Sequence, residues 1–233
     1  MFPSEDKLRL LQRAQIFEPL SSEEVERLGW LLPEITLRPG EVLYSPERPP
    51  NRSLFLVMSG LLRLSRMFRG REFILSVVRA GQIIGETSLV QRRYNEAYAQ
   101  AVESTRIAVI SHNDLRSIIT EYPEVGLKLL GEISQKLHIQ EQRMLDLAFK
   151  EVLGRLASLI LYLIDQEGVP DSDGNTRIAT PYTHEHLAGM IGSQRVAVTK
   201  AFRTLRQEGA IQRSGREPIR VADLDALRRI AEV

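Results

Sequence analysis

The chain has 233 residues, of which 43% are hydrophobic and 26% charged, and its formal net charge is +1. These values describe a soluble globular protein of one large or two modest domains, and no apolar run approaches the roughly 18 residues of a membrane span. There is no cysteine, which excludes disulfides, cysteine-held iron–sulfur clusters and thiol catalysis. The N-terminus lacks the pattern of a secretory signal, so we expect a cytoplasmic protein with no membrane partner.

The first elements are helical. Residues 4–15 have the spacing of a short amphipathic helix, and Ser21 to Glu24 form a capping box that begins a second helix. Pro33 ends this second helix. Four of its apolar side chains are expected to face inward: Val25, Leu28, Leu31 and Leu32.

From Glu34 to about Ile110, short apolar runs alternate with Gly and Pro, which is typical of the strands of a small all-β domain. The turns are expected at Pro39-Gly40, Ser59-Gly60, Arg69-Gly70 and Ala80-Gly81. This pattern predicts a strand sandwich or barrel.

A long helix is predicted after the strands. A short helix covers residues 113–120, and Pro123 can start the next one, which runs to about Phe149 and spans roughly 39 Å. Its residues at the a and d positions of a coiled coil are Leu130, Ile133, Leu137, Gln140, Met144 and Leu147. We therefore expect a homodimer interface, in which Lys136 and Glu141 can pair between chains. The alternative is a single amphipathic helix on its own sheet, because fewer than three heptads is short for a coiled coil.

The stretch from Thr183 to Ile211 predicts a helix-turn-helix. Thr183 caps a first helix that ends near Met190, Gly192 tolerates the left-handed backbone of a sharp turn, and Ser193 caps a second helix over residues 194–208. The second helix has a buried stripe of Val198, Ala201, Phe202 and Leu205. Its opposite face carries Gln194, Arg195, Thr199, Lys200, Arg203 and Arg206, so this helix could enter a DNA major groove.

Flanking elements complete a winged helix-turn-helix over about residues 151–233. A helix is expected over residues 151–166, a polar loop over 168–175 and a strand over 176–179. A turn at Ser214-Gly215 and a strand near residues 219–223 form the wing, and Asp223 caps a last helix.

Charge favours DNA over the alternative of an ordinary helical hairpin with a solvated basic face. Between Thr183 and Arg220, seven Lys and Arg face three Asp and Glu, a net charge of +4 in a chain whose total is +1. The positive charge therefore gathers where phosphates would lie.

This order of elements resembles the cyclic-AMP receptor / fumarate-nitrate regulator family of bacterial transcription factors. The resemblance is carried by Val57 to Gly60, Gly81 to Leu89, Leu147 to Phe149 and Gly192 to Lys200. It implies an α+β protein with a cyclic-nucleotide-binding-like β-roll (jelly roll) and N-terminal helices over residues 1–111, a dimerisation helix region over 112–149 and a winged helix-turn-helix over 150–233. It also implies a homodimeric regulator, with activators among the family, that recognises a palindromic operator in double-stranded DNA and has RNA polymerase as a partner.

The implied DNA-binding residues are Ser193, Gln194, Arg195, Val196, Thr199, Lys200, Arg203 and Arg213. Arg195 matches the family arginine that reads a guanine, because a guanidinium can bond both O6 and N7 of one base. Val196 replaces the acid that reads a cytosine in the cyclic-AMP receptor, so the recognition helix looks more like that of the cyanobacterial global nitrogen regulator. Lys200, Arg203 and Arg213 are expected to hold phosphates.

The implied effector pocket consists of Gly85, Glu86, Thr87, Glu96, Ala97, Lys136, Gln140 and Glu141. Glu96 and Ala97 stand where the cyclic-AMP receptor has the Arg-Ser pair that neutralises the cyclic phosphate, so we expect that cyclic AMP is not the effector. Arg92 and Arg93 could supply the missing charge or could be solvated loop residues.

Lys136 and Glu141 match the 2-oxoglutarate contacts of the nitrogen regulator, although its strand arginine aligns with Ala97. The expectation is another small ligand, such as the anion 2-oxoglutarate, or none.

Two other classes of protein remain as alternatives. A cupin-type metalloenzyme would need histidines inside the barrel, but His112, His138, His184 and His186 all lie outside the β region, so we expect neither an enzyme nor a metal. The second is a small-ligand-sensing module whose helix-turn-helix serves protein interaction, and a steep salt dependence of DNA binding would discriminate against it.

Overall fold

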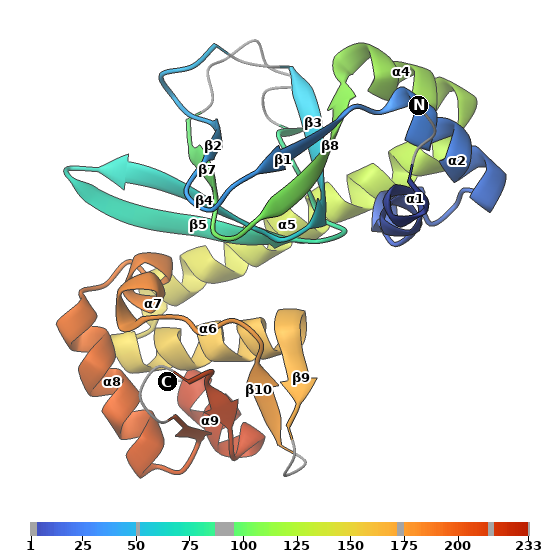
Figure 1. Ribbon diagram of the computed structural model, residues 1–233. Helices are drawn as coiled ribbons and strands as arrows, with labels where there is room; N and C mark the ends of the chain where they lie inside the picture. The colour runs from blue at the N-terminus through green and yellow to red at the C-terminus, as the bar shows by residue number, and fades with distance from the viewer. Residues whose placement is uncertain (1–3, 50–51, 87–95, 172–174, 214–216, 233) are drawn as a thin grey trace. The chain divides into compact units, whose positions relative to one another are not determined.

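The computed structural model describes residues 4–49, 52–86, 96–171, 175–213 and 217–232. The chain divides into two compact units, residues 1–136 and 137–233, and the division falls within one long helix, α5 (Pro123–Phe149) (Figure 1). The expected division into three parts, with boundaries after residues 111 and 149, stays a prediction.

The first unit begins with helices that the capping residues define. Ser4 caps α1 (Glu5–Gln12), a 3-10 turn covers Gln15–Phe17, and α2 (Ser22–Leu31) begins at the predicted capping box of Ser21 and Glu24. The prediction that Leu31 faces inward is wrong, because its side chain is 67% exposed. At about 100° per residue, Leu31 lies about 100° from Leu32 and about 120° from Val25 around the helix, so it falls beyond the edge of the buried face.

Two antiparallel four-stranded sheets form the predicted β-domain. The first has the order β1 (Glu34–Leu37), β8 (Thr105–Ser111), β3 (Ser53–Ser59) and β6 (Ile83–Ile84). The second has the order β2 (Val42–Tyr44), β7 (Tyr98–Ala101), β4 (Leu61–Phe68) and β5 (Arg71–Arg79). The predicted turn glycines Gly40, Gly60, Gly70 and Gly81 all have positive φ, which confirms those turns.

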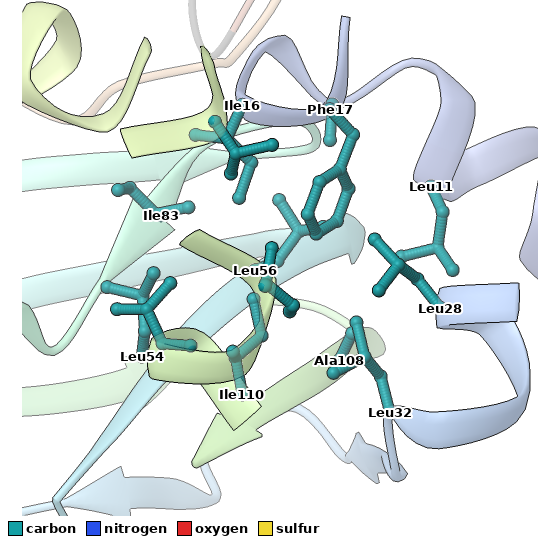
Figure 2. Close-up of a cluster of buried hydrophobic side chains, with 14 of the residues drawn as sticks. Leu11, Ile16, Phe17, Leu28, Leu32, Leu54, Leu56, Ile83, Ala108 and Ile110 are labelled. Atoms are coloured by element: carbon teal, nitrogen blue, oxygen red, sulfur yellow. The ribbon is translucent and has the colours of Figure 1, made fainter. Parts of the chain in front are cut away.

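Two buried clusters hold this unit together. One lies between the strands, around Phe55, Val57, Leu62 and Ile107. The other joins the N-terminal helices to the β3–β8 sheet, and Figure 2 shows Leu11, Leu28 and Leu32 facing Leu56 and Ala108. The unit continues into α4 (His112–Glu121) and the start of α5. Both helices confirm the predictions made from the sequence.

The second unit, beyond its share of α5, is the predicted winged helix-turn-helix. Helix α6 (Val152–Glu167) buries Leu156, Leu159, Ile160 and Leu163. The predicted polar loop after it is wrong at its start, because Gly168–Pro170 forms β9, paired with β10 (Thr176–Ile178). The sheet order is β11 (Ile211–Gln212), β12 (Arg220–Val221), β10 and β9.

Helices α7 (His184–Met190), α8 (Arg195–Gln207) and α9 (Leu224–Ala231) complete the second unit, and Asp223 caps α9 as predicted. The turn expected at Ser214-Gly215 lies outside the described residues.

Candidate nucleic-acid interface

The helix-turn-helix is built by local capping and one glycine. Thr183 accepts a hydrogen bond from the backbone N–H of His186 at 3.1 Å and so caps α7. Gly192 has a φ of 61°, which lets the chain reverse before α8. The prediction that Ser193 caps α8 is wrong. The Ser193 N–H still bonds back to Ala188 at 2.9 Å, whereas the first intrahelical bond runs from the Val198 N–H to the carbonyl of Gln194, which makes Gln194 the cap residue.

Helix α8 separates buried apolar residues from exposed polar ones. Val198, Ala201, Phe202 and Leu205 are buried in the second unit, as predicted. The predicted contact residues of α8 and its cap are all exposed: Gln194, Arg195, Val196, Thr199, Lys200 and Arg203. Val196 is 65% exposed although it is apolar, so it is free to meet another molecule. Ser193 and Arg213 are partly buried.

Arg213 lies at the base of the wing, against the recognition helix. Its guanidinium carbon is 5.7 Å from the centre of the Phe202 ring, and burial lowers the pKa of the group from its ordinary value. Its Nε and Nη1 atoms are buried and have no hydrogen-bond partner among the described residues. These two atoms are too buried to meet an external ligand, so a contact of Arg213 with an anion would use its remaining nitrogen, Nη2.

His184 is a further residue of this surface, which the sequence analysis did not include among the DNA contacts. Its Nδ1 is 2.9 Å from Oγ1 of Thr199 on α8, and its ring centre is 4.7 Å from that of Phe202. Burial, then Arg213, then Arg195 lower the pKa of His184. The one available sequence signal was its place as the first residue of α7.

The first unit contains a second cluster of charged side chains, around Lys136. The Lys136 ammonium donates to the carbonyl of Ile83 at 2.6 Å and lies 3.2 Å from the Glu86 carboxylate. Glu132 lies one helical turn earlier, and burial raises the pKa of its carboxyl group. Burial also raises the pKa of Tyr44, and the negative charge of Glu86 adds to this rise. Two predicted effector residues, Glu86 and Lys136 of α5, thus lie in contact, and Gly85 precedes Glu86 in the chain.

The other predicted effector residues have different surroundings. Glu96 is exposed and forms an ion pair with Arg66 of β4, while Ala97 is buried. Gln140 and Glu141 are exposed on α5, in the second unit. Thr87, Arg92 and Arg93 lie outside the described residues.

The predicted dimer residues of α5 form an exposed apolar stripe. Leu130, Leu137 and Met144 are 64%, 60% and 65% exposed. Ile133 and Leu147 are also exposed, as is Gln140. The partly buried residues of this helix alternate with the stripe, and they are Gly126, Leu129, Glu132, Lys136, Ile139, Arg143 and Asp146. The apolar stripe therefore faces away from the chain's own core.

A double-sheet β-roll together with a winged helix-turn-helix defines the class of two-domain DNA-binding regulators. Residues 34–122 match the cyclic nucleotide-binding domain family, and residues 154–230 match the Crp-like helix-turn-helix domain family. Among the described residues, no helix is both long and apolar enough to traverse a bilayer, and no three His, Cys, Asp or Glu are grouped to hold a metal.

Relatives and solved structures agree with this class. A global nitrogen regulator of Synechocystis is 30% identical over 85% of this chain and 86% of its own length. A CRP-like cAMP-activated global transcriptional regulator of Mycobacterium tuberculosis is 26% identical over 95% and 98%. The crystal structure of a CRP/FNR family transcriptional regulator of Thermus thermophilus has a TM-score of 0.71 and 29% identity, covering 86% of this chain and 99% of that one. The chain belongs to the CRP/FNR family of transcriptional regulators.

Proposed function

We propose that this regulator is a homodimer that binds a palindromic operator through α8 of each protomer. The observation that carries the proposal is the separation of faces on α8, whose apolar side is buried while its cationic side is exposed. A helix of this kind has the shape and charge to enter a major groove.

The exposed stripe of α5 supports the dimer. A long helix in water does not retain an apolar stripe of this extent without a partner for it, and its a/d spacing suits the same stripe of a second copy. Pairing would hold two recognition helices about 34 Å apart, which matches successive major grooves.

Each exposed residue of the interface has an expected role. Arg195 would read a guanine in each half-site through O6 and N7. Val196 would contact an apolar base edge such as the thymine methyl group. Lys200, Arg203 and Arg213 would hold phosphates, with Ser193, Gln194 and Thr199 as further polar contacts.

The effector of this regulator would not be cyclic AMP. Glu96 offers a carboxylate, already paired with Arg66, where a cyclic phosphate would need a cation. The cation nearest to Glu86 is Lys136 of α5, and a small anion such as 2-oxoglutarate would bind it by replacing Glu86 as its partner. Such a ligand would act by favouring one packing of the dimer helices, and so one spacing of the recognition helices. RNA polymerase would be the further partner of an activator of this kind in the cytoplasm.

Selection of duplex DNA from a random pool tests the proposal, with and without cyclic AMP and 2-oxoglutarate. We expect an enriched palindrome with a G in each half-site. Six phosphate contacts per dimer, from three cations in each protomer, predict a slope of log affinity against log salt of about −5. Absence of an enriched sequence, or binding to duplexes that does not weaken with salt, would refute the proposal and favour a helix-turn-helix that binds protein.

A further inference from the structure

The hydroxyl of Thr199 determines which ring nitrogen of His184 carries the proton. Thr199 Oγ1 donates its single hydrogen to the carbonyl oxygen of Arg195 at 2.9 Å. The same oxygen is 2.9 Å from His184 Nδ1, and because the carbonyl can only accept, both contacts are satisfied together only if Nδ1–H donates to Oγ1, which is the tautomer we assign. In the neutral imidazole, Nε2 therefore holds a lone pair, and only the imidazolium can donate a hydrogen bond from Nε2.

Burial and nearby cations disfavour the protonated ring of His184 in the free protein. Arg195 on α8 and Arg213 at the wing face it, and together with burial they lower the pKa of its imidazole. Its stacking on Phe202 fixes the ring between these two elements. The titratable neighbours on its own helix are Glu185 and His186.

The same surface carries a further positive charge. The guanidinium of Arg213 lies over the Phe202 ring that His184 also contacts. The first helix of a helix-turn-helix crosses the DNA backbone, and His184 begins that helix. A backbone phosphate is therefore the anion that this surface would meet.

We propose that His184 binds a DNA phosphate only as the imidazolium, donating from Nε2, so that each protomer takes up one proton when it binds its operator. The neutral ring would present a lone pair to a phosphate oxygen, which is repulsive, whereas the protonated ring supplies both a charge and a donor. The inference rests on the proposed DNA-binding function and adds a requirement to it. Operator affinity should fall as pH rises.

The size of the effect follows from linkage. A ligand that raises the pKa of a group by one unit binds about tenfold more tightly to the protonated form. Between the pKa of His184 in the free protein and that in the complex, log affinity should fall by up to about one per pH unit for each protomer engaged. At a pH above both pKa values, His184 is neutral in the free protein and in the complex, so protonation no longer increases the affinity for the operator.

Fluorescence anisotropy of the full chain with its selected operator tests the proposal, from about pH 5.5 to about pH 8.5 at constant ionic strength. We expect the wild-type affinity to fall across this range. His184→Gln should bind as weakly at low pH as the wild type does at high pH, and His184→Lys should bind without dependence on pH. The matched control is His186→Gln, on the same helix, which should keep the wild-type profile. Retention of that profile by His184→Gln, or its loss in His186→Gln, would overturn the assignment.

Nuclear magnetic resonance on the wild-type protein gives a second readout that requires no variant. The imidazole resonances of His184, titrated with and without the operator, should show a higher pKa in the complex. An unchanged or lower pKa would overturn the proposal. Salt dependence separates this failure from failure of the regulator proposal: salt-sensitive binding without proton uptake refutes only the role of His184, whereas salt-insensitive binding refutes DNA recognition itself.

Discussion

Replacing Leu137 with alanine should weaken the proposed dimer without unfolding the protomer. Leu137 is 60% exposed, and full burial of a leucine side chain is worth about 1.5–3 kcal/mol. Covering the part that is still exposed contributes about 1–2 kcal/mol, and a twofold interface loses the contribution twice, about 2–4 kcal/mol. Dimer dissociation should therefore become about 30- to 700-fold easier.

Sedimentation equilibrium over a wide range of protein concentrations measures this change. Leu31→Ala is the matched control, because Leu31 is 67% exposed but lies on α2, outside the stripe. Leu31→Ala should keep the wild-type melting temperature, whereas Leu137→Ala should lower it only at protein concentrations at which the wild type is a dimer. A Leu137→Ala protein that dimerises as tightly as the wild type, or a Leu31→Ala protein that loses dimerisation equally, would refute the assignment of the stripe.

Three further predictions concern single residues. Gly85→Ala should destabilise the protein by more than the roughly 1–2 kcal/mol expected of Gly70→Ala. The reason is that an added Cβ at Gly85 would lie 2.5 Å from a β3 carbonyl oxygen, whereas a Cβ at Gly70 meets open space. Thermal unfolding of the two variants measures the difference. Hydrogen bonding to Arg106, then to Arg9, lowers the pKa of Asp6. The carboxylate of Asp6 therefore stabilises the folded protein above the pKa of the unfolded chain, and this contribution is lost as pH falls through the pKa of the folded protein. Asp6→Asn should flatten the acid side of the plot of melting temperature against pH, and an unchanged plot would contradict this. Arg195→Ala should weaken operator binding by about 1–3 kcal/mol and relax the preference at one base, whereas an equal loss on scrambled duplexes would assign Arg195 to phosphate.

Elements set by local pattern could be predicted closely from the sequence. Pro123 and Phe149 bound α5 as expected, and Thr183, Gly192 and the α8 stripe reproduce the predicted helix-turn-helix. In each case the signal lies within a few residues: a capping side chain, a glycine with positive φ, or apolar residues three and four apart. The same locality explains the β-domain turns.

Errors arose where a backbone hydrogen bond or a distant strand decided the outcome. Gln194 rather than Ser193 caps α8 because the Ser193 N–H is still engaged in the turn. Gly168–Pro170 is a strand only because β10 supplies its partners. Local composition indicated a break in regular structure at both places, but it does not encode which backbone groups of the turn are already bonded or that Gly168–Pro170 pairs with a later strand.

The cluster around Phe202 shows the same limit for the candidate site. His184, Thr199 and Arg213 come from α7, α8 and the wing, and no spacing rule connects them. Counting charge located the surface but could not identify which side chain lacks a partner or which nitrogen holds a proton. Those properties depend on distances of a few ångströms between separate elements.

Helix α5 departs in part from the usual rule of apolar residues inside and polar residues outside, although Val125 and Leu129 pack on the core of the first unit. In the first unit, its partly buried positions include Glu132 and Lys136, while Leu130 and Ile133 are exposed. A monomer gains nothing from this arrangement, since burial costs the charges their hydration and exposure forfeits the hydrophobic contribution of the apolar side chains. The proposed dimer accounts for the exposed face, and the pairing of Lys136 with Glu86 and the Ile83 carbonyl accounts for the partly buried cation. One helix would thus serve both proposals, the second protomer on its apolar side and the small ligand on its charged side, and a ligand that changed the contacts of Lys136 would act on the element that is proposed to set the spacing of the recognition helices.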